Sequence, residues 1–168
     1  GGMIGYNLGI EHPARLRSLI ACDSRPDAPP QYAAYFQNRI DIVAEGGMEN
    51  VIPLTIERWF TPETQAANPP VLERVREMIR TTDPVGHEGL CRTLKTLSFG
   101  PRLHEISVPT LILGGEQDVG APTEVLEEAA GKIPGAKHVV IPNACHITAL
   151  EQPDDFYAAV NGFLSEQA

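Results

Sequence analysis

The sequence predicts an α/β protein in which a mostly parallel sheet is flanked by helices and interrupted by a helical insertion. Short apolar runs alternate with helical patterns near both ends of the chain, and the links between them are short. Between these regions, residues 26–97 show helical periodicity and no comparable strand. Strands that alternate with helices through short links favour a parallel sheet covered by helices.

Composition limits the classes of function. The chain has 168 residues, 42% hydrophobic and 21% charged, and its net charge of −9 opposes binding to nucleic-acid phosphates. No apolar run approaches the roughly 20 residues of a membrane-spanning helix. Cys22, Cys91 and Cys145 form no CxxC pair, so we expect no disulfide framework and no metal site. The cysteine usage favours a cytoplasmic protein, and we expect no nucleic-acid or membrane partner and no cofactor; the oligomeric state stays open.

The first segment, residues 1–25, predicts a helix followed by a strand. The helix spans Gly1 to about Glu11 and ends at the His12-Pro13 step, because a residue before proline is disfavoured in the α conformation. The strand is expected at Leu16–Cys22, with Asp23 and Ser24 closing it.

The last segment, residues 98–168, repeats the alternation. Val108–Gly115 is nearly all apolar, as in a strand buried on both faces, and Lys137–Ile141 is a second strand. A helix is expected from Pro122 with Gly131 as its stop, and another from Pro153. The last helix is expected to bury Phe156, Val160, Phe163 and Leu164.

The middle segment, residues 26–97, predicts a separate helical cap. Helices are expected at Tyr32–Ala44 and Pro84–Leu97, with a third behind Pro69-Pro70. That third helix has an apolar stripe at helical spacing, made by Val71, Leu72, Val75, Met78 and Ile79.

An acid and a histidine each follow one of the last two predicted strands. Asp118 lies in a glycine-rich loop after the first, and His146 lies in the loop after the second. In open α/β sheets this edge collects catalytic groups, and a carboxylate that orients a histidine base is part of a nucleophilic triad. Alone, Asp118 is better explained as a turn former or helix cap, and His146 as a structural or solvated histidine. Together and in this order they predict a catalytic pair.

No serine stands in a nucleophile position. The serines are Ser18, Ser24, Ser98, Ser107 and Ser165, and none has the strand-to-helix G-x-S-x-G setting.

The order of these motifs resembles the α/β-hydrolase superfamily, whose chain order is serine, acid, histidine. "GGMIG" resembles the end of its nucleophile elbow, and "EHPARLRSLIACDS" resembles the strand after the elbow helix. "VPTLILGGEQDVGAP" resembles the acid loop and "PNACHITALEQPDDF" the histidine loop, where Cys145 replaces a common small residue. The resemblance implies that the serine lies two residues before Gly1, outside the given sequence. The 168-residue chain alone is therefore expected to be inactive.

Within the superfamily, "ERWFTPE" and "TTDPVGHEGLCRTL" are similar to the 3-oxoadipate enol-lactonase group. That resemblance implies a carboxylic-ester hydrolase, a lactonase or esterase that opens a small acidic enol-lactone in aromatic catabolism. Related esterases, haloperoxidase-like enzymes and carbon–carbon bond hydrolases share most of these marks.

Four residues of the predicted cap are candidates for substrate binding. Trp59 and Phe60 could line an apolar pocket, although an aromatic pair packed between cap and core explains them as well. Arg58 and His87 could meet a substrate carboxylate, as an acidic lactone requires, although Arg58 is better explained as a solvated residue of a charged helix.

Two other interpretations remain. The chain could be a non-catalytic ligand-binding protein on the same fold, in which Asp118 and His146 are polar groups of a pocket. It could also be a fragment whose exposed strand edge prevents a stable sheet.

Overall fold

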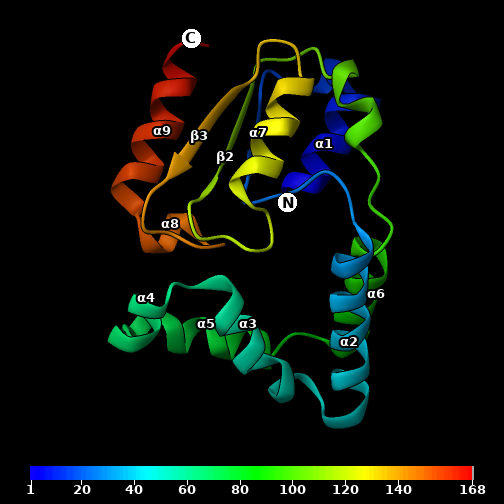
Figure 1. The fold of residues 1–168 in the computed structure, drawn as a ribbon, viewed down its shortest axis with the longest axis vertical. Helices are drawn as coiled ribbons and strands as arrows, with labels where there is room; N and C mark the ends of the chain where they lie inside the picture. The colour runs from blue at the N-terminus through cyan, green and yellow to red at the C-terminus, as the bar shows by residue number, and fades with distance from the viewer. Residues whose placement is uncertain (168) are drawn as a thin grey trace. The chain divides into compact units, whose positions relative to one another are not determined.

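A parallel sheet forms the centre of one structural unit in the computed structural model, which describes residues 1–167 (Figure 1). The unit comprises Gly1–Pro26 and the described residues from Phe99 onward. Its strands are β1 (Leu19–Cys22), β2 (Thr110–Gly115) and β3 (Lys137–Ile141). They lie in the order β1-β2-β3, and both neighbouring pairs are parallel.

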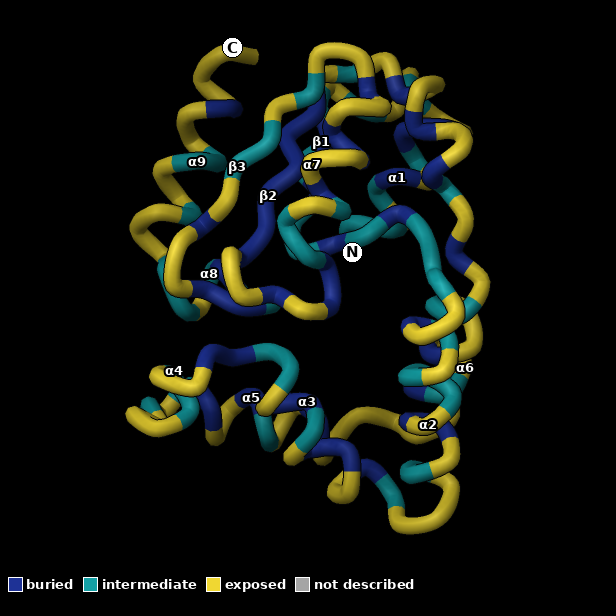
Figure 2. Tube along the Cα trace, viewed as in Figure 1, coloured by how far each residue is buried: buried dark blue, intermediate teal, exposed yellow. Residues whose placement is uncertain are grey.

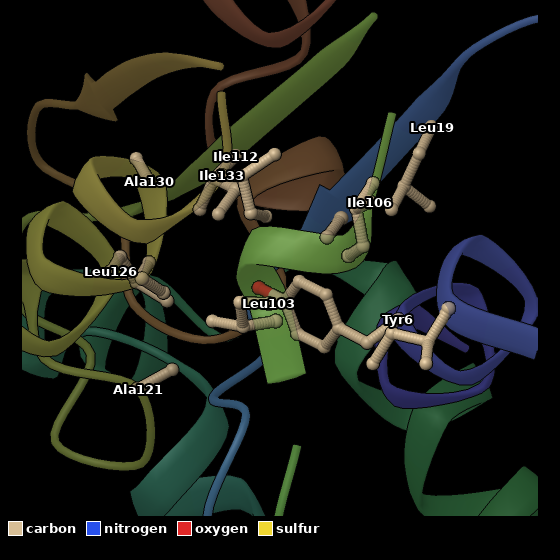
Figure 3. Close-up of a cluster of buried hydrophobic side chains, with 12 residues drawn as sticks. Tyr6, Leu19, Leu103, Ile106, Ile112, Ala121, Leu126, Ala130 and Ile133 are labelled. Carbon is tan, nitrogen blue, oxygen red and sulfur yellow. The ribbon is translucent and has the colours of Figure 1, made fainter. Parts of the chain in front are cut away.

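Helices cover both faces of this sheet. Helices α1 (Gly2–Glu11) and α7 (Thr123–Lys132) pack on one face, where Tyr6, Leu126 and Ile112 share a core (Figure 3). Helix α9 (Pro153–Ser165) covers the other face, where Phe163 packs with residues 111, 113 and 141. Neighbouring residues of β2 thus serve opposite faces, as strand geometry requires. All six residues of β2 are buried, as the colouring in Figure 2 shows, and the predicted helix-flanked parallel sheet is confirmed.

Prolines explain two differences between predicted and observed element ends. Strand β1 begins at Leu19 rather than Leu16, because its pairing with β2 starts beside Pro109, which has no N–H to donate. Helix α7 continues through Gly131, the predicted stop, and ends at Lys132. Pro134 ends it, since the residue before a proline is driven to the extended conformation that Ile133 adopts.

The second unit, Asp27–Ser98, is helical. Its helices are α2 (Pro30–Gly46), α3 (Ile52–Trp59), α4 (Pro62–Ala67), α5 (Pro70–Arg80) and α6 (Pro84–Leu94), with a 3₁₀ turn η2 at Met48–Val51. Four of these helices start on a proline, whose fixed φ and missing N–H suit the first helical position: α2, α4, α5 and α6. An antiparallel bridge between Asp27 and Ser98 closes the unit where its two ends meet.

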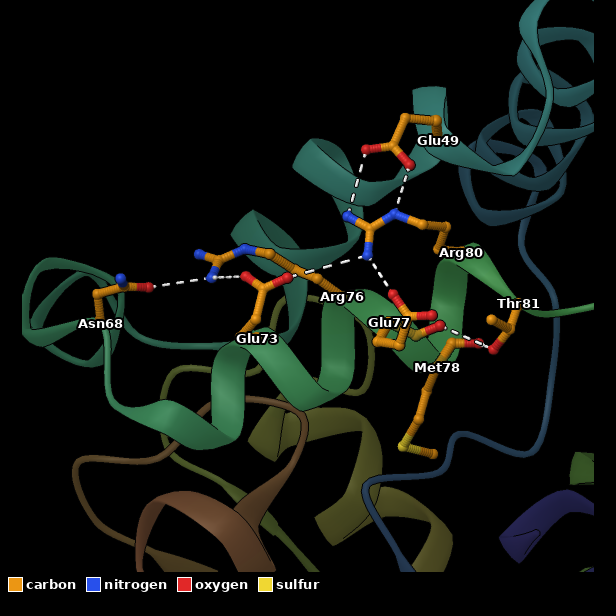
Figure 4. A network of polar contacts seen from close by, with 8 residues as sticks. All are labelled: Glu49, Asn68, Glu73, Arg76, Glu77, Met78, Arg80 and Thr81. Carbon is orange, nitrogen blue, oxygen red and sulfur yellow. Dashed lines mark hydrogen bonds and ion pairs between the residues drawn. The ribbon is translucent and has the colours of Figure 1, made fainter.

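Helix α5 has one buried face and one charged face. Leu72, Val75 and Ile79 are buried, whereas Met78, predicted as part of the apolar stripe, is 63% exposed. Met78 precedes Ile79 by one position and so lies beside the row of buried residues at helical spacing, not in it. On the charged face, Arg80 pairs with residues 49 and 77 (Figure 4). These exposed pairs add little stability, because water and salt screen them.

The shorter elements of the sheet unit are two 3₁₀ turns and one short helix. The turns are η1 (Pro13–Arg15) and η3 (Gly100–Glu105), and the helix is α8 (Thr148–Glu151). Leu164 of α9, predicted to be buried, is 44% exposed, because the helix contacts the sheet through Phe163 and the partly buried Phe156 and Val160. None of the helices described over residues 1–167 is long and apolar enough to cross a bilayer.

Candidate active site

All three strands end at the same edge of the sheet, and a titratable residue follows each strand there. Asp23 directly follows β1, Asp118 lies in the loop after β2, and His146 lies in the loop after β3. The carboxyl ends of parallel strands meet at one edge of a sheet, so three segments far apart in sequence converge.

The predicted acid and histidine are in direct contact. Nδ1 of His146 lies 2.8 Å from Oδ2 of Asp118, and the backbone N–H of Gly120 donates to Oδ1 of the same carboxylate at 2.6 Å. The Asp118 side chain is fully buried, whereas that of His146 is 28% exposed. Because a carboxylate accepts hydrogen bonds, Nδ1 is assigned as the protonated nitrogen and Nε2 as the nitrogen that can accept a proton. A carboxylate and a histidine that act as orienting acid and general base need this geometry.

The loops that carry the pair are joined by direct hydrogen bonds. The N–H of Gln117 donates to the Ala144 carbonyl at 2.9 Å, and the Cys145 thiol donates to the Gln117 carbonyl at 3.5 Å. Gly115 allows this approach: a Cβ at that position would lie 2.1 Å from the Cys145 carbonyl oxygen. Only glycine fits without moving one of the two loops.

Cys145, which departs from the resemblance, has a structural role. It is 5% exposed, and burial, followed by the nearby Asp118 charge, raises the pKa of its thiol to about 11. A thiol with that pKa is protonated at neutral pH and is a poor nucleophile. Its N–H also donates to the Glu151 carboxylate of α8 at 2.7 Å, which fixes the backbone beside His146.

Asp23 belongs to the same group, although the sequence analysis gave it no role beyond closing a strand. The Thr148 hydroxyl donates to its Oδ2 at 2.9 Å, and the Gly115 N–H donates to its Oδ1 at 3.3 Å. Burial raises the pKa of this carboxyl group to about 6, partly offset by the Thr148 hydrogen bond and the His146 charge. The signal that could have revealed it is its position immediately after a parallel strand.

The candidate substrate-binding residues lie in the helical unit, at different depths. Phe60 is 1% exposed and Trp59 is partly buried. The Arg58 guanidinium lies 4.1 Å from the centre of the Tyr35 ring, a cation–π contact, and His87 is buried on α6.

Arg39 of α2, which the sequence analysis did not single out, joins His87. The Arg39 side chain is buried, and its described hydrogen-bond partners are all neutral acceptors: Tyr35 Oη at 3.2 Å, Thr55 Oγ1 at 2.7 Å and His87 Nε2 at 3.3 Å. A guanidinium can only donate, so His87 Nε2 accepts and the imidazole is neutral. Burial, and then the Arg39 charge, lowers the pKa of His87 accordingly.

Within residues 1–167, no three His, Cys, Asp or Glu side chains are arranged to hold a metal ion.

A parallel sheet between helix layers, with a hydrogen-bonded acid and histidine after successive strands, defines the α/β-hydrolase architecture. The family model described as alpha/beta hydrolase fold matches residues 1–153. The chain belongs to this family.

Relatives within the family carry hydrolase names. The chain is 28% identical over 169 residues to 3-oxoadipate enol-lactonase 2 of Acinetobacter baylyi, covering 98% of this chain and 60% of that protein. A hydrolase from Pseudomonas aeruginosa superposes with a TM-score of 0.91 at 30% identity, covering 98% of this chain and 61% of that one. The enol-lactonase from Burkholderia xenovorans gives 0.91 at 27% identity, covering 98% and 62%. The chain thus spans about 60% of the length of these relatives.

Proposed function

We propose that this protein is a serine-type hydrolase of small esters or lactones, in which Asp118 and His146 are the orienting acid and the general base. The observation that carries the proposal is the 2.8 Å contact between Asp118 Oδ2 and His146 Nδ1 at the carboxyl ends of β2 and β3. In this proposal the nucleophilic serine lies outside the 168 residues, before Gly1.

The proposed mechanism follows from the roles of the two nitrogens. His146 Nε2 takes the proton of the serine hydroxyl as the serine oxygen attacks the acyl carbonyl. Asp118 holds the imidazole in this tautomer and stabilises the imidazolium that forms. His146 then gives the proton to the leaving alkoxide and afterwards deprotonates the water that releases the acyl group.

For the substrate, we propose a small acidic lactone, with 3-oxoadipate enol-lactone as the first candidate. Two related proteins named enol-lactonase support this choice. In the helical unit, proposed here as the substrate cap, Arg39 is a buried guanidinium with neutral partners, beside His87. In this proposal a substrate carboxylate pairs with this guanidinium. Arg58 would assist, and Trp59 and Phe60 would provide apolar surface.

The test is turnover by a protein that carries both this chain and the proposed serine. His146→Ala and Asp118→Asn should each lower kcat by on the order of a thousandfold or more, because the base or its correct tautomer is lost. His12→Ala, which removes an exposed histidine of the same unit, is the matched control and should keep full activity. Comparing the enol-lactone with a neutral aryl ester separates lactonase from general esterase.

Two outcomes would change the proposal. Turnover by the 168 residues alone, abolished by His146→Ala, would show that the nucleophile lies within them. Tight lactone binding without hydrolysis by the serine-containing protein would favour the non-catalytic alternative.

A further inference from the structure

We infer that Asp23 is a positioning residue that fixes the histidine loop against the acid loop through one carboxylate. Its effect on catalysis rests on the proposed hydrolase function. The inference that Asp23 holds the two loops together depends only on the contacts of Asp23 itself.

The two oxygens of Asp23 accept hydrogen bonds from two different segments, one beside each loop. Oδ1 accepts the N–H of Gly115, the last residue of β2, three positions before Asp118. Oδ2 accepts the hydroxyl of Thr148, which is fully buried at the first position of α8, two positions after His146. Asp23 therefore links the start of the acid loop to the end of the histidine loop, in addition to the direct contacts between the two loops at Gln117 and Cys145.

The backbone of Asp23 is itself well anchored. Its N–H donates to the Leu113 carbonyl at 2.8 Å, and the buried Tyr6 hydroxyl of α1 donates to the carbonyl of the next residue, Ser24, at 2.9 Å. The residue has a φ of +49°, in the left-handed region that Asp, Asn and Gly tolerate best. An anchored carboxylate restricts the motion of the groups that donate hydrogen bonds to it. One of these donors is the hydroxyl of Thr148, two positions after His146.

The electrostatic surroundings favour a positioning role over a role in proton transfer. The titratable groups that face Asp23 are Asp118, His146 and the Cys22 thiol. Its oxygens are occupied by the Gly115 and Thr148 bonds, whereas Asp118 makes the direct bond to the imidazole. Removing the hydrogen bonds of Asp23 should thus disturb the geometry of the base without removing a reacting group.

Three variants separate the hydrogen bonds from the charge and from the backbone. Asp23→Asn keeps both contacts, because its Oδ1 can accept from Gly115 and its Nδ2 can donate to Thr148 Oγ1. Asp23→Gly keeps the left-handed backbone but removes both contacts. Thr148→Val removes one contact and leaves residue 23 unchanged. Asp154→Asn, an exposed carboxylate of α9, is the control.

The first measurement needs no substrate. The Nδ1–H proton of His146 should give a far-downfield NMR resonance, and Asp118→Asn identifies it by its loss or marked shift. Asp23→Gly and Thr148→Val should broaden it or speed its exchange with water by tenfold or more, with the fold retained by circular dichroism. Asp23→Asn and Asp154→Asn should leave it unchanged. An unchanged resonance in folded Asp23→Gly and Thr148→Val would overturn the inference, as would its loss in folded Asp23→Asn.

The second measurement is activity in the serine-containing protein. Asp23→Gly and Thr148→Val should lower kcat about ten- to a hundredfold with KM within about twofold, since misplacing a base affects the chemical step. Asp23→Asn should restore kcat to within about threefold. A fall in kcat for Asp23→Asn equal to that for Asp23→Gly would refute positioning through hydrogen bonds. If the protein hydrolyses no substrate, the proposed function fails while the NMR result still decides the role of Asp23.

Discussion

Replacing Asp23 with asparagine should make the folded protein more stable above neutral pH. Burial raises the pKa of the Asp23 carboxyl group from 3.8 to about 6 in the folded state. The folded protein therefore holds this proton more tightly than the unfolded chain does, and ionisation of Asp23 opposes folding. The free energy of unfolding accordingly falls as pH rises between these two values and stays lower above them.

The size of the effect follows from the shift. About two pKa units correspond to about 3 kcal/mol, an upper bound for one partly buried carboxylate. Asp23→Asn removes the charge and can keep the bonds to Gly115 and Thr148. The variant should thus gain up to about 3 kcal/mol over the wild type at about pH 8, and this gain should shrink toward about pH 4.

Urea denaturation of both proteins across this pH range is the assay, because the other titrating groups largely cancel in the difference. Glu127→Gln removes an exposed carboxylate of α7 in the same unit and should show a much smaller pH-dependent difference. A variant no more stable than the wild type at pH 8, with the same pH dependence, would refute the conclusion that the Asp23 charge opposes folding.

Three further predictions test the packing around the site. Gly115→Ala should destabilise the sheet unit by several kcal/mol in a thermal or urea melt, because its Cβ would meet the Cys145 backbone, whereas Gly131→Ala, with open space at its Cβ, should gain about 0.5–1 kcal/mol. A loss of stability for Gly131→Ala as large as that for Gly115→Ala would contradict this account. Tyr6→Phe should cost about 1–3 kcal/mol, since it leaves the Ser24 carbonyl unsatisfied in the interior; an unchanged melting midpoint would argue that water reaches that carbonyl. The Cys145 thiol, buried and with a pKa of about 11, should resist alkylation in the native protein at neutral pH and react after unfolding, as mass spectrometry can measure; rapid native alkylation would place it in an exposed loop instead.

Much of the sheet unit was predictable because its signals are local. The continuous apolar run of β2 and the proline that starts α9 specify their elements with neighbouring residues alone. The contact between Asp118 and His146 could be anticipated because each follows such a strand, and parallel strands bring those positions to one edge. Leu164 was wrongly predicted to be buried, and Met78 of the predicted apolar stripe is exposed, since apolar periodicity shows which side of a helix is apolar but not how much of that side is covered.

The sequence by itself determined the class of fold and pointed to Asp118 and His146 as the proposed acid and base, through patterns a few residues long. Only the tertiary structure placed Asp23 and Arg39, because their partners are distant in the chain. Asp23 lies 92 positions from Gly115 and 125 from Thr148, and Arg39 lies 48 from His87. Side-chain hydrogen bonds over such separations depend on how packed elements meet, and no periodicity within one element encodes that.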